Sequence, residues 1–234
     1  MIVAAAQTLP RASTRLAGGT PAVVWPRVKE LESLTANQLR DSVAAGMVTA
    51  VVPFGSIEHQ GPHLPLGADA LVADAVGLEV ANRLGALLAP SFRVGCATGH
   101  AALTGTLSLS AETIGDLGWG VGHGLARDGV RVIAFVSTHG GNLKPLRAAA
   151  ARLSESLPAC VVCAPRGDLG PTPGAHSGEW LTSVLLALRP ELVRIEQAPA
   201  ELAGEVARAS AERGRDHLER FVASVVAQVP VTSG

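Results

Sequence analysis

The sequence predicts a single α/β domain in three layers, with helices on both faces of a mostly parallel central sheet. Short apolar runs alternate with longer amphipathic segments, a pattern typical of strand–helix–strand units. The length of 234 residues fits one domain with a well-filled core. Hydrophobic residues make up 47% of the chain and aromatic residues only 3%, so Ala, Val and Leu are expected to fill the interior. Residues 1–20 are interpreted as a flexible N-terminal arm, and residues 21–234 as the domain.

In the first half of the chain, a helix, a strand, a second helix and a second strand are expected to follow one another. Thr35 is a good N-cap for the first helix. The apolar run after this helix is typical of a buried strand, and the next segment has the spacing of an amphipathic helix. The elements are expected at Thr35–Ala45, Val48–Phe54, Ala70–Leu84 and Ala86–Pro90, before an irregular or extended segment at Arg93–Leu109.

The second half continues the alternation. Ser110 is a good N-cap, and Val130–Val136 is the clearest strand in the chain. Arg189-Pro190 ends a helix, because the residue before a proline disfavours the helical conformation. The helices are expected at Ala111–Arg127, Leu143–Leu157, Gly178–Leu188 and Gly204–Val229, with a strand at Cys160–Ala164 and a Gly/Pro loop at Pro165–His176.

Composition sets limits on partners and compartment. A net charge of −1 gives no electrostatic reason to expect binding to nucleic acid or to an anionic membrane. The sequence has no stretch of the roughly 18 apolar residues that a membrane-spanning helix needs. The segment Ile2–Ala6 lacks the basic flank and long apolar region of a signal peptide, so the cytoplasm is the expected compartment.

Two patterns are better explained by structure than by function. Cys160-Val-Val-Cys163 lies in an apolar run, and residues three apart on a strand face opposite sides. A buried strand is therefore favoured over a metal or redox site, and three cysteines are too few for a disulfide framework. The glycine-rich segment Gly118–Gly124 lies inside a predicted helix and does not follow a strand, so close helix or subunit packing is favoured over a phosphate-binding loop.

The strongest functional signal is a group of acidic and histidine residues in one loop. Its members are Glu58, His59, His63 and Asp69. Two carboxylates and two imidazoles in a turn-forming loop would repel and desolvate one another unless a cation drew them together. The loop follows the strand expected at Val48–Phe54, and ligands bind at the carboxyl ends of strands in α/β sheets. The loop therefore predicts a metal site.

Two more polar clusters lie at later junctions between a strand and a helix. Ser137-Thr-His-Gly-Gly-Asn142 directly follows the clearest strand, and the glycines beside His139 leave room for a ligand at the imidazole. The segment His176-Ser-Gly-Glu179 precedes a helix, whose dipole alone could favour a Glu at that position. Because a parallel sheet brings successive junctions together along one edge, the three clusters are expected to converge.

These residues resemble the motifs of the creatininase (creatinine amidohydrolase) family. The family hallmarks are Gly-Ser-x-Glu-Gln-His-Gly-Pro-His-Leu-Pro-x-x-x-Asp, Asn-Gly-His-Gly-Gly-Asn and His-Ala-Gly-x-x-Glu-Thr-Ser. The matching stretches here are Gly55–Asp69, Ser137–Asn142 and His176–Ser183. His100 and Gly105–Ser108 resemble the family's His-x-x-Phe-Pro-Gly-Thr segment. The resemblance covers about residues 35–195.

The resemblance implies a two-metal centre, usually of zinc or manganese. One metal would be bound by Glu58, by His139 and by Asp69, whose carboxylate bridges to the second metal. A metal bound there would lower the pKa of its water toward about 7 and polarise the substrate carbonyl. His176 would pass a proton to the leaving nitrogen, and Glu179 would serve as a ligand or as the base that orients water.

The ligands of the second metal depart from the family pattern. The family uses a His two places after the Glu, the bridging Asp and an acid in the middle motif, and two of these positions are Gln60 and Gly141 here. His59 and Gln60 are transposed relative to the family order, and a Gln oxygen is a weaker zinc ligand than an imidazole. One firm metal is therefore expected, with His59 or Gln60 as the candidate ligand of a second metal that is weak or absent.

The remaining polar residues of the motifs are expected to support the ligands or to contact the substrate. His63 is expected to support the ligands and not to bind metal. Three further residues are assigned to substrate binding or to support, namely His100, Asn142 and Trp180. The resemblance also implies a homohexamer that acts on a small-molecule or short-peptide substrate.

Two functional hypotheses remain open. The first is a metal-dependent amidohydrolase that cleaves a non-standard, often cyclic, amide C–N bond with metal-activated water. The family includes enzymes that act on creatinine, on formamide-type pyrimidine intermediates and on the precursor peptide of the redox cofactor mycofactocin. The second is a member that has lost catalysis and serves as a binding or scaffold subunit, as Gln60 and the replacement of a family acid by Leu181 suggest. The retained acidic and histidine residues favour the hydrolase, because uncompensated polar groups in a concave site are costly without a role.

Overall fold

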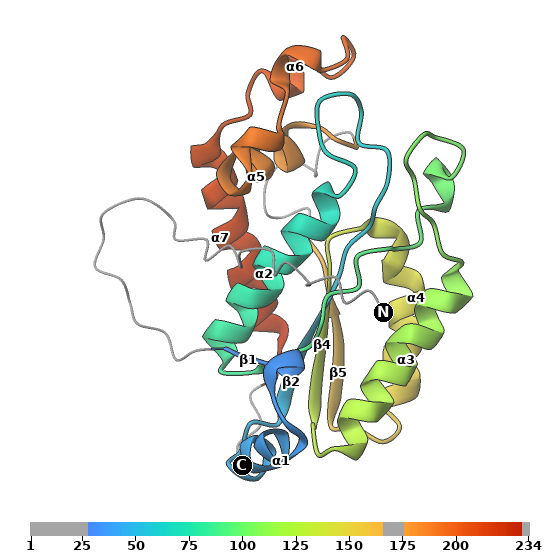
Figure 1. Cartoon of the computed structure of the whole chain (residues 1–234), viewed down its shortest axis with the longest axis vertical. Helices are drawn as coiled ribbons and strands as arrows, with labels where there is room; N and C mark the ends of the chain where they lie inside the picture. The colour runs from blue at the N-terminus through green and yellow to red at the C-terminus, as the bar shows by residue number, and fades with distance from the viewer. Residues whose placement is uncertain (1–27, 166–175, 231–234) are drawn as a thin grey trace, which may run out of the picture.

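A five-stranded parallel sheet forms the centre of the structure, a computed structural model that describes residues 28–165 and 176–230 (Figure 1). The strands lie in the order β1-β3-β2-β4-β5, and each neighbouring pair is parallel. Their bounds are β1 Lys29–Glu30, β2 Thr49–Phe54, β3 Leu87–Leu88, β4 Val132–Ser137 and β5 Ala159–Cys163. The parallel sheet predicted from the sequence is confirmed.

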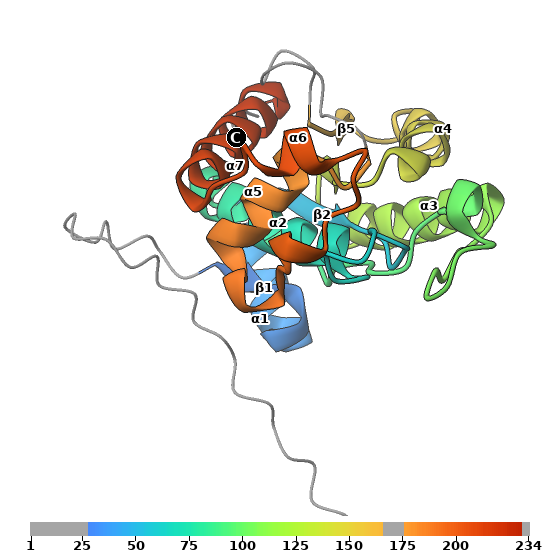
Figure 2. The same ribbon diagram turned by 90° about the horizontal axis from the view of Figure 1, so that it is seen from above.

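Helices cover both faces of the sheet, which confirms the three-layer architecture (Figures 1 and 2). One face is covered by α2 (Ala68–Leu84), α5 (Glu179–Leu188) and α7 (Ala211–Gln228), and the other by α3 (Ala111–Arg127) and α4 (Leu143–Leu153). Helix α1 (Ala36–Ala44) lies at the end of the sheet where β2 begins. The short helices are η1 Leu31–Ser33, η2 Thr98–His100, η3 Gly140–Asn142, η5 Pro190–Leu192, η6 Ile195–Gln197 and α6 Ala203–Val206.

The hydrophobic core has two halves, one on each face of the sheet. In β4, Val132, Ala134 and Val136 pack toward α2, α5 and α7, while Ile133 and Phe135 pack toward α3 and α4. All five side chains are fully buried. Strands that are buried on both faces carry continuous apolar runs instead of alternating polar and apolar residues.

The predicted helix starts are confirmed by their caps. The Thr35 hydroxyl accepts a hydrogen bond from the backbone N–H of Gln38, whose side chain accepts one from the backbone of Thr35, so α1 begins with a capping box. The Ser110 hydroxyl accepts a hydrogen bond from the backbone N–H of Thr113, and α3 has the predicted bounds. Most other predicted elements differ from the observed ones by one or two residues at an end.

The prediction of one long helix over Gly204–Val229 is wrong, because α6 and α7 are separate helices. Ser210, between them, is extended, and its hydroxyl accepts a hydrogen bond from the backbone N–H of Arg213. Its own N–H donates to the Ser183 hydroxyl of α5. A serine that caps α7 and bonds to a neighbouring helix has no place inside a continuous helix.

Two smaller differences concern element ends. Helix α4 stops at Leu153 instead of Leu157, and the Ser154 hydroxyl bonds back to the carbonyl of Ala150. Strand β1 was not predicted, because two charged residues carry no periodic signal and form a strand here only by pairing with β3. The expected arm at residues 1–20 and most of the loop at Pro165–His176 lie outside the described residues.

Both structural interpretations of the glycine and cysteine patterns are confirmed. Cys160 and Cys163 pack into opposite halves of the core, and burial raises the pKa of the Cys160 thiol to about 12. Gly118 and Gly122 of α3 face α4, and a Cβ added at Gly122 would overlap the Leu153 side chain. The glycines therefore permit close packing of α3 on α4.

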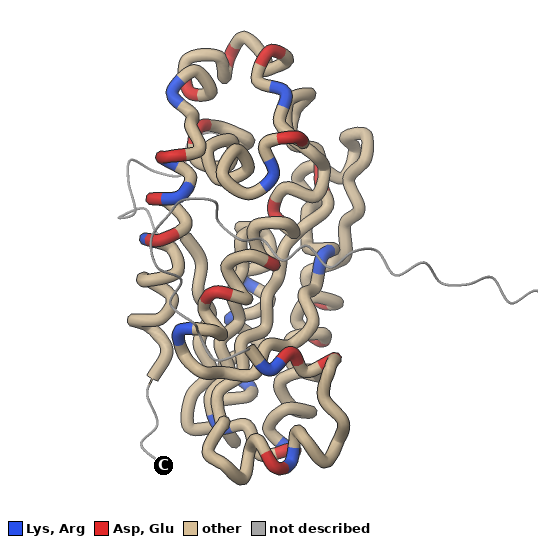
Figure 3. The backbone as a smooth tube through the Cα atoms, turned by 60° about the vertical axis from the view of Figure 1, so that its left-hand side comes forward, with Lys and Arg blue, Asp and Glu red and all other residues tan. Residues whose placement is uncertain are grey.

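Charged residues of both signs are interspersed over the described backbone (Figure 3). Arg83 of α2 pairs with Glu79 at 3.0 Å and with Glu219 of α7 at 2.6 Å, so one arginine connects two helices on the same face of the sheet. Among the described helices, none combines the length and the apolar character that crossing a membrane requires.

Gly122→Ala is expected to destabilise the protein and Gly124→Ala to stabilise it. Both glycines lie in α3, but a Cβ at Gly124 would meet nothing within 4 Å. The first change should lower the free energy of unfolding by about 1–3 kcal/mol through overpacking. The second should raise it by about 0.5–1 kcal/mol, because glycine is unfavourable inside a helix. Urea unfolding measures both, and equal destabilisation of the two variants would contradict this packing.

Candidate metal centre

The carboxyl ends of β2, β4 and β5 lie next to one another, because these strands are neighbours in the sheet. The segments that follow them carry Glu58, His139 and His176, and all three residues line one cavity of about 340 Å³. Asp69 lines the same cavity from the first turn of α2. The structure thus brings together the three polar clusters that the sequence places at successive strand ends.

The Glu58 carboxylate lies at the centre of the site and is 1% exposed. Its Oε1 is 2.9 Å from Nδ1 of His139, and its Oε2 is 2.8 Å from Nδ1 of His100. The Gln60 amide nitrogen donates to Oε1 at 3.3 Å. Imidazoles from two different loops therefore contact the two oxygens of one buried carboxylate.

Asp69 is the second carboxylate of the site and is 6% exposed. Its Oδ2 accepts hydrogen bonds from the Ser56 hydroxyl at 2.7 Å and from the Gln60 amide at 3.2 Å. Nδ1 of His139 lies 3.5 Å from the same oxygen. The Thr138 hydroxyl donates to the Asp69 carbonyl at 2.8 Å, which fixes the loop after β4 to the start of α2. The N-terminus of a helix also favours a negative charge there.

Burial and neighbouring charges act in opposite directions on these groups. Burial raises the pKa of Glu58, but hydrogen bonds with His139 and His100 outweigh it and lower that pKa to about 2. Burial lowers the pKa of His139, but hydrogen bonds with Asp69 and Glu58 outweigh it and raise that pKa to about 10. The pKa of Asp69 is raised, chiefly by burial. Two carboxylates this close to each other need positive charge beside them, from protons or from a metal ion.

The donor atoms fit a divalent metal ion. One ligand atom from each of Glu58, Asp69 and His139 lies within 4.8 Å of the others. Nε2 of His139 donates to the Cys96 carbonyl at 2.9 Å, which leaves Nδ1 facing the carboxylates as the nitrogen available to a metal ion. Two carboxylates and one imidazole are donors that zinc and manganese accept.

A buried chain of hydrogen bonds supports the site from the side of α5. The Ser177 hydroxyl donates to Oε1 of Gln60 at 2.7 Å, and Nε2 of His63 donates to the Ser177 carbonyl at 3.0 Å. Burial lowers the pKa of His63, which favours the neutral imidazole. Because Oε1 of Gln60 is bonded to Ser177, its amide nitrogen faces the carboxylates. In this orientation Gln60 presents an N–H donor, and not its oxygen, to Glu58 and Asp69.

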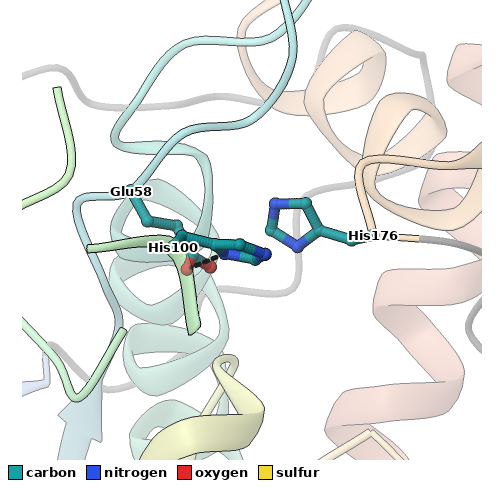
Figure 4. A group of neighbouring side chains, drawn as sticks. All are labelled: Glu58, His100 and His176. Carbon is teal, nitrogen blue, oxygen red and sulfur yellow. Dashed lines mark hydrogen bonds and ion pairs between the residues drawn. The ribbon is translucent and has the colours of Figure 1, made fainter. Parts of the chain in front are cut away.

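His100 and His176 lie beside each other near the Glu58 carboxylate (Figure 4), where His100 contacts Oε2 and His139 contacts Oε1. Their ring centroids are 4.1 Å apart. Nε2 of His176 donates to the His59 carbonyl at 2.7 Å. The His59 imidazole itself is not among the described side chains that line the cavity, so His59 contributes its backbone to the site.

Glu179 does not reach the metal donors. Its Oε1 accepts hydrogen bonds from the Ser183 hydroxyl and from Nε of Arg213, both at 2.7 Å, and His217 lies 3.3 Å from Oε2. Burial raises the pKa of Glu179, but Arg213 and Ser183 outweigh it and lower that pKa to about 2. The carboxylate therefore joins α5 to α7 as a paired charge.

Two more residues named from the sequence have clear positions. Asn142 is fully buried, and its side chain bonds to the Gly55 carbonyl at 2.9 Å and to the Cys96 N–H at 2.8 Å. It therefore joins the loops after β2 and β3. Trp180 lines the cavity, beside Leu181.

Sequence reasoning missed three residues that orient the site, namely Ser56, Thr138 and Ser177. Ser56 and Ser177 lie in the matched motifs close to Glu58 and His176, and this adjacency is the signal that the sequence offers for them. Ser177 also has a φ of 64°, a left-handed conformation that costs free energy in a residue other than glycine. No composition rule singles out a serine for such a conformation.

This chain is similar to known proteins in sequence and in fold. Residues 32–224 match the family model described as creatininase, creatinine amidohydrolase. A mycofactocin precursor peptide peptidase of Mycobacterium ulcerans is 35% identical over 193 residues, which cover 78% of this chain and 73% of that protein. A creatinine amidohydrolase of Pseudomonas putida is 29% identical over 191 residues, with 70% and 73% covered. A solved structure described as "Creatininase Mn" has the same fold, with a TM-score of 0.74 at 24% identity over 86% of this chain and 96% of that one.

Asp69→Ala is expected to remove bound metal, whereas Gln60→Ala should retain most of it. Asp69 offers a buried anionic ligand, while Gln60 presents only an N–H donor to the carboxylates. Elemental analysis of protein purified without a His-tag measures the metal, and circular dichroism checks that both variants fold. Equal metal content in the two folded variants would contradict this assignment.

Glu179→Gln is expected to lower the melting temperature at pH 7 but not near pH 2. The pKa of Glu179 is about 2 in the folded protein, below the ordinary value of 4.5. Its stabilising effect is therefore complete above pH 4.5 and is lost as the pH falls toward 2. Thermal unfolding of wild type and variant across this range measures the difference, with the exposed Glu155→Gln as the control. A difference that did not change with pH would exclude the ion pair as its cause.

Proposed function

The chain belongs to the creatininase family, and from this membership and its buried site we propose that it is a metal-dependent hydrolase of an amide C–N bond. The observation that carries the proposal is the convergence of Glu58, Asp69 and His139 in one cavity. Their donor atoms suit zinc or manganese, and the solved relative of the same fold is described with manganese. We propose one firmly bound divalent metal ion at these three residues.

In this proposal the protein residues bind the metal, orient the substrate and move one proton. A bound divalent metal activates water and polarises a carbonyl. His176 lines the cavity and has one nitrogen, Nδ1, that is not bonded to the His59 carbonyl. We assign it the transfer of a proton to the leaving nitrogen. Glu179, which the sequence suggested as a base, is assigned instead to holding α5 in place through Arg213 and His217.

We propose a short peptide as the substrate class, ahead of a cyclic amide. The peptidases of mycofactocin precursor peptides share 34–36% of their residues with this chain, and the creatinine amidohydrolase shares 29%. The cavity is lined by the candidate metal donors and also by the apolar side chains of Trp180, Leu181 and Leu143. Apolar lining residues suit an amino-acid side chain next to the cleaved bond.

The test is hydrolysis of a mycofactocin precursor peptide and of creatinine, followed by mass spectrometry. The metal-loaded protein is expected to cleave the peptide, and chelation should abolish turnover until zinc or manganese is restored. His176→Ala should retain the first metal but lose roughly 10²–10⁴ in turnover, the usual contribution of general acid–base catalysis. His123→Ala, an exposed histidine on α3, is the matched control.

Three results separate the alternatives. Turnover of creatinine but not of the peptide would replace the proposed substrate class. Loss of metal in His176→Ala would show that His176 is a ligand of the first metal. A folded protein that binds no metal and cleaves neither substrate would favour the non-catalytic binding subunit.

We also propose that the protein is a homo-oligomer, with a hexamer as the expected size. Leu66, Leu103 and Leu107 are exposed on two loops that touch each other beside the site. Exposed apolar side chains that cluster in this way mark interaction surfaces.

Light scattering is expected to give a mass several times the chain mass of 23.8 kDa. Leu107→Asp should lower that mass, because a charge would be buried in the interface. Leu78→Asp, at an exposed leucine of α2, serves as the control. A wild-type mass equal to one chain would end the oligomer proposal.

A further inference from the structure

We propose that Glu58, His100 and His176 form a second divalent-cation site, which shares the Glu58 carboxylate with the first. The donors suit zinc in particular. The site uses Oε2 of Glu58, whereas His139 contacts Oε1, so that Glu58 and not Asp69 connects the two sites. Binding of a cation at this second site does not depend on the proposed function. Its effect on proton transfer by His176 does depend on the proposed function.

The geometry around Glu58 divides its two oxygens between the two sites. Oε1 faces His139 at 2.9 Å, and Oε2 faces His100 at 2.8 Å. One ligand atom from each of Glu58, His100 and His176 lies within 4.8 Å of the others. The rings of His100 and His176 meet at the carboxylate from two different segments of the chain (Figure 4).

The chemistry of the three donors selects the cation. Zinc bound by two imidazoles and one carboxylate keeps a fourth position open. Magnesium and calcium prefer oxygen ligands, so they fit this site poorly. Tetrahedral zinc with bonds of about 2.1 Å holds its ligand atoms roughly 3.4 Å apart, so these atoms, which lie within 4.8 Å of one another, would move closer when the cation binds.

The hydrogen bond that His176 makes leaves one of its ring nitrogens available to a cation. Its Nε2 donates to the His59 carbonyl at 2.7 Å, so Nδ1 is the ring nitrogen that is available to a cation. A backbone carbonyl that fixes the tautomer in this way is the usual outer partner of a metal-binding imidazole. His176 is exposed and the His100 side chain is 31% exposed, so a cation can enter from solvent without opening the core.

The second site implied by the family motif lacks two of its expected ligands in this chain. Gln60 presents an N–H donor where an imidazole is expected. Gly141 stands where an acid is expected, and a Cβ at this position would overlap the Cys96 carbonyl. The imidazoles of His100 and His176, which the first site does not use, offer a second set of donors next to Oε2 of Glu58.

Occupation of the second site has a consequence for the proposed reaction. A nitrogen that binds a cation cannot accept or donate a proton. If His176 transfers the proton, the first equivalent of zinc should support turnover and the second should suppress it. This consequence depends on the proposed function, whereas binding of the second cation does not.

The experiment titrates chelator-treated, untagged protein with zinc and measures binding by calorimetry and by elemental analysis after gel filtration. Wild type is expected to bind two zinc ions per chain. His100→Gln and His176→Gln should each bind one, because each retains Glu58, Asp69 and His139. His123→Gln should bind two, as the control for removal of a histidine. Glu58→Gln should lose both ions, and circular dichroism checks its fold.

One zinc ion per wild-type chain at saturation would overturn the second site, as would two ions in both His100→Gln and His176→Gln. Activity is then followed at one and two equivalents of zinc with the substrate that the protein cleaves. Two bound ions without any turnover would refute the proposed function and leave the site standing. Full turnover at two equivalents would refute the suppression of proton transfer by the second ion.

Discussion

The arrangement of the site depends on the burial of the Glu58 carboxylate. A buried carboxylate without partners would cost several kcal/mol of folding free energy. Its partners come from separate segments, with Gln60 in the same loop, His100 after β3 and His139 after β4. The hydrogen bonds and ion pairs of the Glu58 carboxylate therefore hold three loops together at the carboxyl edge of the sheet. The cavity lies among these loops.

The backbone must permit these loops to approach one another. A Cβ at Gly55 would overlap the backbone of α2 at Ala70, and a Cβ at Gly95 would overlap the Gly55 carbonyl. Asn142 then joins these loops through both ends of its amide. Ser177 is held in a left-handed conformation by its bonds to Gln60 and His63. Small residues and one strained residue thus permit the close approach of the loops that carry the candidate metal donors.

Local sequence predicts what depends on local chemistry. Apolar runs predicted the strands, and N-caps such as Ser110 predicted the helix starts. The motif around Glu58 predicted the candidate metal donors. Contacts between distant segments were not predictable, because no periodicity encodes them. Arg213 of α7 forms an ion pair with Glu179, which is therefore bonded to α7 and not to the site. The hydrogen bond from Ser177 to the Gln60 oxygen determines that the Gln60 amide nitrogen faces the carboxylates. These partners are far apart in sequence, so the role of each residue depends on the fold.

The two proposed cation positions differ in charge and in exposure, and this difference sets the order in which they fill. The inner group has two buried carboxylates, Glu58 and Asp69, so a divalent cation there balances their charge in a region of low dielectric. The outer group adds two imidazoles, and no further carboxylate, to the same Glu58 side chain. A second cation would meet a carboxylate whose charge is already shared, and the exposed His176 would hold it in contact with solvent. The inner position is therefore expected to bind a divalent cation more tightly, and occupation of the outer position is expected to depend on the concentration of free metal ion.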